Sequence, residues 1–130
     1  MKHFRYELVV KESDLDSNGH VNNIEYVRWM QEAAIAHSDA AGCTEATFAE
    51  GASWFARTHH IEYLRPAMQG DEVVVRTWVE DTRRAASLRK YEMYRGDQLL
   101  AKGETDWVFV DSASGRPRSI PDAIKAMFGD

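Results

Sequence analysis

The sequence predicts an α+β fold, in which a five-stranded antiparallel sheet wraps around one long central helix. Three observations carry this prediction. A single strong helical pattern occupies positions 22–41, and β-type sequence follows from position 53 to position 111. The links between the expected strands are too short for parallel crossovers, so consecutive strands pair antiparallel. One sheet can bury one helix only by curling around it.

The expected strands are rich in aromatic and β-branched residues and are separated by turn-forming residues. The first is expected at positions 4–11, before the helix. The other four are expected at 53–64, 72–81, 86–95 and 98–111. A Pro- and Gly-containing segment at 66–70, a short link at 82–84 and a Gly96–Asp97 hairpin turn separate them.

The long helix has recognisable ends. Either Asn22 or Asn23 can cap its first turn, and Gly42 stands where a left-handed C-terminal cap is expected. About 19 residues at about 1.5 Å each give roughly 28 Å, so the helix is expected to run through the centre of the domain. A short helical turn is expected within 44–51 and a final helix at 121–128. The apolar positions at helical spacing are Ile24, Val27, Met30, Ala34 and Ile35.

Composition limits the possible classes of protein. A chain of 130 residues fits one domain, expected to span 1–130. The net charge of −5 disfavours sequence-independent binding to nucleic acid or to an anionic membrane. The charged N-terminus does not resemble a signal peptide, and no apolar run is long enough to span a bilayer. The single cysteine, Cys43, cannot form an intramolecular disulfide. A soluble, cytoplasmic protein is therefore expected.

The segment 14–26 is the most unusual in the chain. Asp14, Asp16, His20 and several amides occupy the turn before the helix. A helix N-terminus presents free N–H groups and partial positive charge, which can stabilise an oxyanion. A carboxylate beside it can attack a carbonyl or accept a proton from water. The same residues are also ordinary turn and capping residues, and chemistry alone favours that plainer interpretation.

The motif Asp-Leu-Asp-Ser-Asn-Gly-His-Val-Asn-Asn-x-x-Tyr at 14–26 resembles the signature of hot-dog-fold thioesterases. This family includes the 4-hydroxybenzoyl-CoA type and the acyl-carrier-protein (ACP) thioesterases. The resemblance continues through 26–33 and resumes at 61–72, and it covers roughly 4–112. It implies hydrolysis of acyl-CoA thioesters to free acid and CoA. It also implies homodimers or homotetramers with active sites at the subunit boundary.

The resemblance also implies roles for individual residues. Asp16 would be the nucleophile or general base, and Asn18 and His20 would position it or a water. The backbone at Asn23, at the start of the helix, would polarise the thioester carbonyl. Pro66 stands where the plant-like enzymes carry a second carboxylate, which favours the simpler aspartate mechanism. No cofactor is expected, because coenzyme A is part of the substrate.

Substrate-binding candidates come from other segments. Tyr26 could contact the ligand or pack helix against sheet, and Trp54 could line an acyl pocket or belong to the core. His59 could contact the ligand, but packing on the strand or exposure to solvent is the stronger expectation. His59 and His60 point to opposite faces of the strand, so they cannot bind one metal together, and no metal is expected. A basic patch expected on the turn and strand at 83–90 could meet CoA phosphates or simply be solvated. Its members are Arg83, Arg84, Arg89 and Lys90.

Three alternatives to the acyl-CoA thioesterase interpretation remain at this level. An acyl-ACP thioesterase would use the same chemistry on a different carrier. A non-catalytic acyl-CoA-binding module would keep the pocket without turnover. A dehydratase of the same fold would need a histidine–carboxylate pair, and the match to that subfamily is poor.

Overall fold

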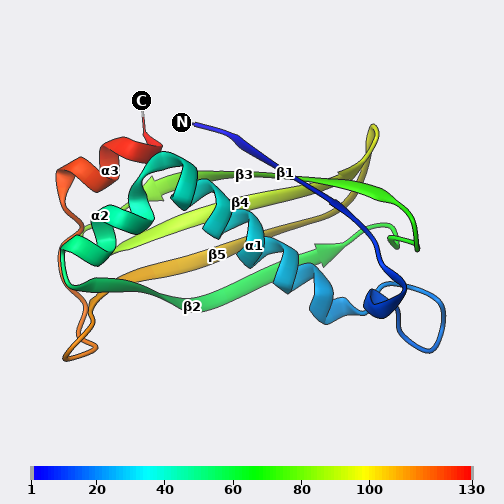
Figure 1. Ribbon diagram of the computed structural model, residues 1–130, viewed down its shortest axis with the longest axis horizontal. Coiled ribbons are helices and arrows are strands. Elements are labelled where there is room, and N and C mark those ends of the chain that lie inside the picture. Colours follow the sequence, from blue (N-terminus) through cyan, green and yellow to red (C-terminus); the bar gives the residue numbers. More distant parts are fainter. Residues whose placement is uncertain (1, 130) are drawn as a thin grey trace.

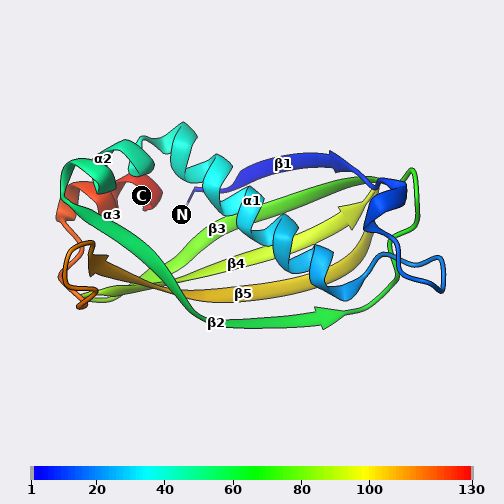
Figure 2. The same ribbon diagram turned by 60° about the horizontal axis from the view of Figure 1, so that its bottom comes forward.

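The computed structural model describes residues 2–129, and it has one antiparallel sheet with a long helix against one face (Figures 1 and 2). The sheet order is β1-β3-β4-β5-β2. The strands are β1 (Phe4–Val9), β2 (Ala52–Tyr63), β3 (Glu72–Thr82), β4 (Ala86–Arg95) and β5 (Gln98–Asp111). The helices are η1 (Glu12–Asp14), α1 (Asn23–Ala41), α2 (Cys43–Ala49) and α3 (Asp122–Phe128). None of these helices is both long enough and apolar enough to cross a bilayer.

The predicted sheet and long helix are confirmed. The four strands after the helix match their expected ranges to within one residue at each end, and the Gly96–Asp97 hairpin joins β4 to β5. Asn22, rather than Asn23, caps α1: its side chain accepts a hydrogen bond from the Ile24 N–H at 3.2 Å. Gly42 ends the helix with φ 85°, the left-handed conformation that the sequence predicts.

The buried face of α1 differs from the predicted one. Ile24 and Ile35 are 69% and 59% exposed, although both belong to the apolar positions at helical spacing. Larger aromatic side chains define the true face, since Tyr26 and Trp29 pack with ring centroids 5.0 Å apart. The helix therefore lies across the concave face of the sheet with its outer side uncovered (Figure 2). Its buried residues are Tyr26, Trp29, Met30, Ala33, Ala34 and His37.

The helix packs closely on the sheet at Gly103 in β5. A Cβ added at this glycine would lie 3.0 Å from the Met30 sulfur and 3.0 Å from the His60 carbonyl oxygen. Met30 is fully buried, so its side chain has little room to move away. The absence of a side chain at position 103 thus allows close packing of α1 on β5 and β2.

We expect Gly103→Ala to lower the free energy of unfolding by about 1–3 kcal/mol, because it overpacks this contact. Urea denaturation of the variant and the parent measures the difference. Lys102→Ala, at the exposed neighbouring position, is the control and should change stability by no more than about 0.5 kcal/mol. A neutral Gly103→Ala would mean that the helix can lift from the sheet at no cost.

The two edges of the sheet are β1 and β2. Strand β2 is twelve residues long and pairs on one side only, with β5. Phe55, on this strand, is 60% exposed. A long edge strand with one free side and an exposed apolar side chain is a ready template for pairing with another strand.

Candidate active site

The turn before α1 is closed by its own backbone. An isolated β-bridge joins Leu15 to Val21. Within this bridge the Asp16 N–H donates to the His20 carbonyl at 2.7 Å, and the Gly19 N–H donates to the Asp16 carbonyl at 3.2 Å. Turn-forming residues therefore fold as the sequence predicts, into a tight loop at the start of the helix.

The Asp16 side chain folds back into this loop. Its Oδ1 accepts hydrogen bonds from the backbone N–H groups of Asn18, at 2.8 Å, and His20, at 3.3 Å. Within residues 2–129, Oδ2 makes no hydrogen bond. One oxygen thus holds the carboxylate in place, and the other is free in a partly exposed side chain. Asn18 and His20 reach Asp16 through their backbones, while their side chains face solvent.

The first turn of α1 has one unused donor. The Asn22 side chain accepts a hydrogen bond from the Ile24 N–H. The Asn22 carbonyl accepts a hydrogen bond from the Glu25 N–H at 2.9 Å. Among the described residues, the Asn23 N–H has no acceptor. The Asn23 carbonyl accepts a hydrogen bond from the Tyr63 hydroxyl at 3.2 Å, which ties the start of the helix to the end of β2. The chain therefore presents a free N–H at the positive end of α1.

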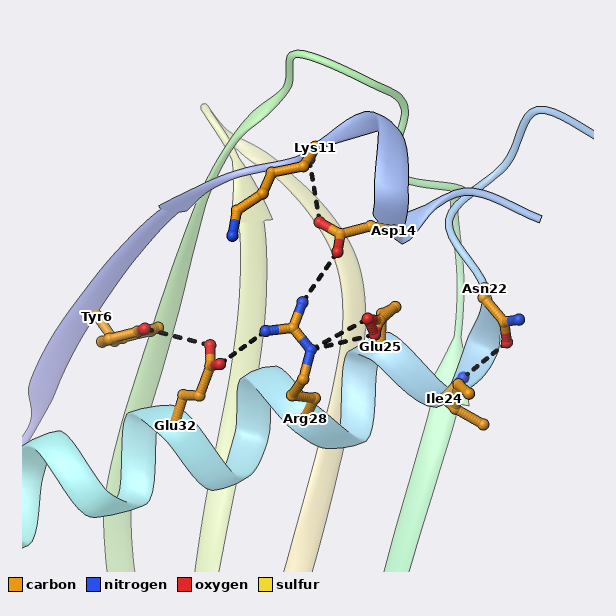
Figure 3. A network of polar contacts seen from close by, with 8 residues as sticks. All are labelled: Tyr6, Lys11, Asp14, Asn22, Ile24, Glu25, Arg28 and Glu32. Atoms are coloured by element: carbon orange, nitrogen blue, oxygen red, sulfur yellow. Dashed lines mark hydrogen bonds and ion pairs between the residues drawn. The ribbon is translucent and has the colours of Figure 1, made fainter.

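An arginine network joins the turn to the helix (Figure 3). Arg28 binds Asp14 at 2.9 Å, Glu25 at 3.0 Å and Glu32 at 2.7 Å. The Asp14 carboxylate also accepts the Lys11 N–H at 3.0 Å, and it is buried. The hydrogen bond to Glu25 and the nearby carboxylates raise the pKa of Arg28. This network positions the loop that carries Asp16.

Tyr26 has packing partners. It is only 3% exposed, and its hydroxyl accepts a hydrogen bond from the Ala67 N–H at 3.0 Å. Its ring packs edge-on against Tyr63 with centroids 5.1 Å apart. Burial is the main cause that raises its pKa. These contacts join helix to sheet, and the ligand contact expected from the resemblance stays a prediction.

The basic patch predicted at 83–90 does not form as a single surface. Arg83 pairs with Asp106 and, at 3.5 Å, with Asp81, and its hydrogen bond to Asp106 raises its pKa. Arg84 is exposed. Arg89, by contrast, is 4% exposed and points inward. Successive side chains on a strand alternate between faces, and Arg89 shares the buried face of β4 with Tyr91.

Arg57 also binds the Asp106 carboxylate, so this aspartate pairs with two arginines, Arg57 and Arg83. Burial alone would raise the pKa of Asp106, but the hydrogen bonds from Arg83 and Arg57 lower it overall. His59 lies on the same strand as Arg57, and its Nδ1 contacts the Thr105 hydroxyl at 2.8 Å. Partial burial of its ring lowers the pKa of His59. None of these residues touches Asp16 through a hydrogen bond.

A cavity of about 480 Å³ lies along the second half of α1, and Trp54 is part of its wall. Asp16 and the rest of the 14–26 turn do not line it. The Trp54 indole N–H donates to the Thr47 hydroxyl at 3.1 Å, which fixes the ring at the edge of the cavity. Arg89 lines the same cavity. The structure therefore places Trp54 and Arg89 on the wall of one cavity, which the Asp16 turn does not line.

Sequence reasoning missed two residues: His37, which contacts Arg89, and Arg28, at the centre of the arginine network. His37 is buried and its Nδ1 accepts a hydrogen bond from Arg89 at 2.9 Å. Burial first, and the nearby Arg89 charge second, lower the pKa of His37 to about 4. Arg28 was not singled out either. The i+3 and i+4 spacing of Glu25 and Glu32 about Arg28 was the available signal.

Residues 10–128 match the thioesterase-like superfamily. The match covers most of the chain, and the chain belongs to this superfamily.

Two curated relatives are similar over most of the chain. An L-carnitine dehydrogenase/betainyl-CoA thioesterase of Ruegeria pomeroyi is 28% identical over 85% of the chain, which spans only 23% of that longer protein. The acyl-CoA thioesterase YbgC of Haemophilus influenzae is 24% identical, over 96% of this chain and 93% of that one. The second relative thus corresponds to the present chain along nearly its whole length.

The fold also matches solved structures. A 1,4-dihydroxy-2-naphthoyl-CoA thioesterase from Synechocystis superposes with a TM-score of 0.89 at 20% identity, and covers 99% of this chain and 97% of that one. At this identity the likeness shows the fold alone. The five-stranded sheet with its central helix is therefore the hot-dog fold that the 14–26 motif led us to expect.

Proposed function

We propose that the protein hydrolyses acyl-CoA thioesters to free acid and CoA, with Asp16 as the reacting carboxylate. Membership of the thioesterase-like superfamily supports the reaction class. The names of the Ruegeria and Haemophilus relatives support a CoA carrier. The single observation that carries the assignment to Asp16 is its carboxylate geometry: two backbone N–H groups hold Oδ1, and Oδ2 makes no hydrogen bond to any of residues 2–129.

The thioester carbonyl would lie against the start of α1, with its oxygen toward the Asn23 N–H. Charge that develops on this oxygen is stabilised by the N–H and by the positive end of the helix. Asn18 and His20 contribute through their backbone donors, which aim the Asp16 carboxylate. Their exposed side chains are available to hold a water or part of the substrate.

Two routes are consistent with this arrangement. In the first, Asp16 Oδ2 attacks the carbonyl carbon, the CoA thiolate leaves, and water hydrolyses the resulting anhydride to regenerate the carboxylate. In the second, Asp16 takes a proton from water, the hydroxide attacks, and the proton passes to the leaving thiolate. Both routes consume one water and release one acid and one CoA thiol.

We further propose that the active unit is a homodimer built on the free edge of β2. A two-fold axis at a sheet edge sets two copies of the same strand antiparallel. The end of β2 lies next to the start of α1, through the Tyr63–Asn23 hydrogen bond. Antiparallel pairing would bring the start of the partner's α1 beside the first residues of β2, where Trp54 lies. The partner's Asp16 would then face the cavity that Trp54 lines.

A thiol-release assay tests the proposed reaction. Purified protein should hydrolyse at least one member of a panel of short, medium, long and aromatic acyl-CoAs, with free CoA detected by a thiol reagent. The same acyl groups on ACP distinguish the carrier, and a large preference for ACP would contradict the CoA proposal. Binding of acyl-CoA without any turnover would contradict the enzymatic assignment and support a binding module.

A further inference from the structure

The cavity along α1 is large enough for a small-molecule ligand. Its volume of about 480 Å³ falls within the range of roughly 300–1,000 Å³ that is typical of ligand pockets. Its walls come from the second half of α1, from α2 and α3, and from the inner face of the sheet. Most of the wall is apolar, and includes Ala34, Ile35, Trp54, Val79, Ile124 and Phe128.

Arg89 is a buried cation in this apolar wall. It is 4% exposed, and none of the ion pairs among residues 2–129 involves its guanidinium. Its Nη1 donates to His37 Nδ1 at 2.9 Å and to the Thr77 hydroxyl at 3.0 Å. Phe128 lies over it, with the ring centroid 5.3 Å from Cζ. All three partners are neutral: His37 has a pKa of about 4 and carries no charge at pH 7.

A charge in this position is costly unless something pairs with it. Burial lowers the pKa of Arg89, yet a guanidinium stays protonated in proteins. A buried charge without a counter-charge costs several kcal/mol. The neutral partners satisfy N–H groups on Nη1 and leave the charge uncompensated.

The remaining donors of Arg89 face accessible space. Nε and Nη2 have no acceptor among residues 2–129, yet the described structure contains no buried side-chain nitrogen or oxygen that lacks a partner. These two nitrogens must therefore be reachable, and the cavity is the space that Arg89 lines. Nε and Nη2 together form the fork that matches the two oxygens of a carboxylate.

We infer that this cavity binds a carboxylate carried on an apolar body, with the carboxylate paired to Arg89 Nε and Nη2. The apolar walls would take the hydrocarbon or aromatic part of the ligand. The link to the reaction rests on the proposed function: the carboxylate is either that of a free acid product or the far-end carboxylate of a dicarboxylic acyl group. In both cases the ligand would neutralise the Arg89 guanidinium, which has no ion-pair partner among residues 2–129.

Equilibrium binding tests the recognition without any turnover. By titration calorimetry, the parent should bind octanoate at least tenfold more tightly than octan-1-ol. Arg89→Met removes the charge and keeps a side chain of similar length. It should therefore reduce the ratio of octanoate to octan-1-ol affinity to near one, while octan-1-ol still binds. Arg84→Met, an exposed arginine on the nearby turn, is the matched control and should keep the parental ratio.

A second variant protects the test against misfolding of Arg89→Met. Ala34→Phe places a ring in the cavity and should abolish binding of both octanoate and octan-1-ol. The inference is overturned if the parent shows no preference for octanoate, if folded Arg89→Met keeps that preference, or if Ala34→Phe binds octanoate as the parent does. None of these measurements requires hydrolysis, so they stand whether or not the proposed function fails.

Kinetics then distinguish the two sources of the carboxylate. If the far end of the acyl group is recognised, KM for octanedioyl-CoA should be at least tenfold below KM for octanoyl-CoA, and Arg89→Met should remove the difference. Equal KM values together with tight octanoate binding would assign the cavity to the free acid. Weak binding of octanoate and equal KM values would together rule out both sources.

Discussion

Asp16→Asn is expected to lower kcat/KM for a hydrolysed acyl-CoA by at least about 10²-fold. The asparagine side chain keeps an Oδ1 that can accept the N–H groups of Asn18 and His20, so the turn is retained. It has no second carboxylate oxygen to attack the thioester or to take a proton from water. The loss should therefore fall mainly on kcat. Steady-state thiol release measures it, with thermal unfolding as the check that the fold is intact.

Asp97→Asn is the matched control for this experiment. Asp97 is an exposed aspartate in the hairpin between β4 and β5, and among residues 2–129 no hydrogen bond or ion pair joins its side chain to the turn at 14–26. Its kcat and KM should equal those of the parent. Parental activity in a well-folded Asp16→Asn variant would show that another group reacts with the thioester, and the proposed mechanism would then have to be abandoned.

His37 should make the protein markedly less stable in mild acid. Its pKa is about 4 in the folded protein, against an ordinary value of 6.5. Between these two pH values the unfolded chain binds a proton that the folded protein does not. The free energy of unfolding therefore falls as the pH drops from about 6.5 to about 4, by up to about 3 kcal/mol from this residue. Burial and the neighbouring Arg89 charge are the main causes.

His37→Gln isolates this effect. The glutamine amide oxygen can accept the Arg89 hydrogen bond, and glutamine does not titrate. Urea unfolding between pH 7 and pH 4.5 should show a decline in the parent that the variant largely lacks. His59→Gln is the companion variant, because burial lowers the pKa of His59 as well, and it should keep the part of the decline that comes from His37. Parallel pH profiles for parent and His37→Gln would contradict the prediction.

The fold was predictable because its signals are local. The Asn22 cap, the Gly42 terminator and the Gly96–Asp97 turn each depend on a few neighbouring residues, and short links force antiparallel pairing. The buried face of α1 was harder to predict, because Ile24 and Ile35 follow helical spacing as well as Tyr26 and Trp29 do. Which of these two faces of α1 packs against the sheet depends on the curvature of the sheet.

The site was predictable only in part. The turn around Asp16 is contiguous in sequence, so a motif can reveal it. The environment of Arg89 comes instead from α1, β3, β4 and α3, through His37, Thr77 and Phe128. An arginine on a strand near two other arginines favours a surface assignment, since charged side chains are seldom fully buried. Its inward direction follows from the register of β4, which the sequence alone leaves open.

Because α1 packs closely over Gly103, the residues that can be accommodated at positions 30 and 103 depend on each other. A methyl group at position 103 would displace the Met30 side chain and the β2 backbone at His60. Positions 30 and 103 are therefore expected to vary together among related sequences, with a shorter residue in the helix wherever the strand carries a side chain. A side chain at position 103 should therefore cost less stability when position 30 carries a shorter residue, because the contact with the helix side chain is then removed.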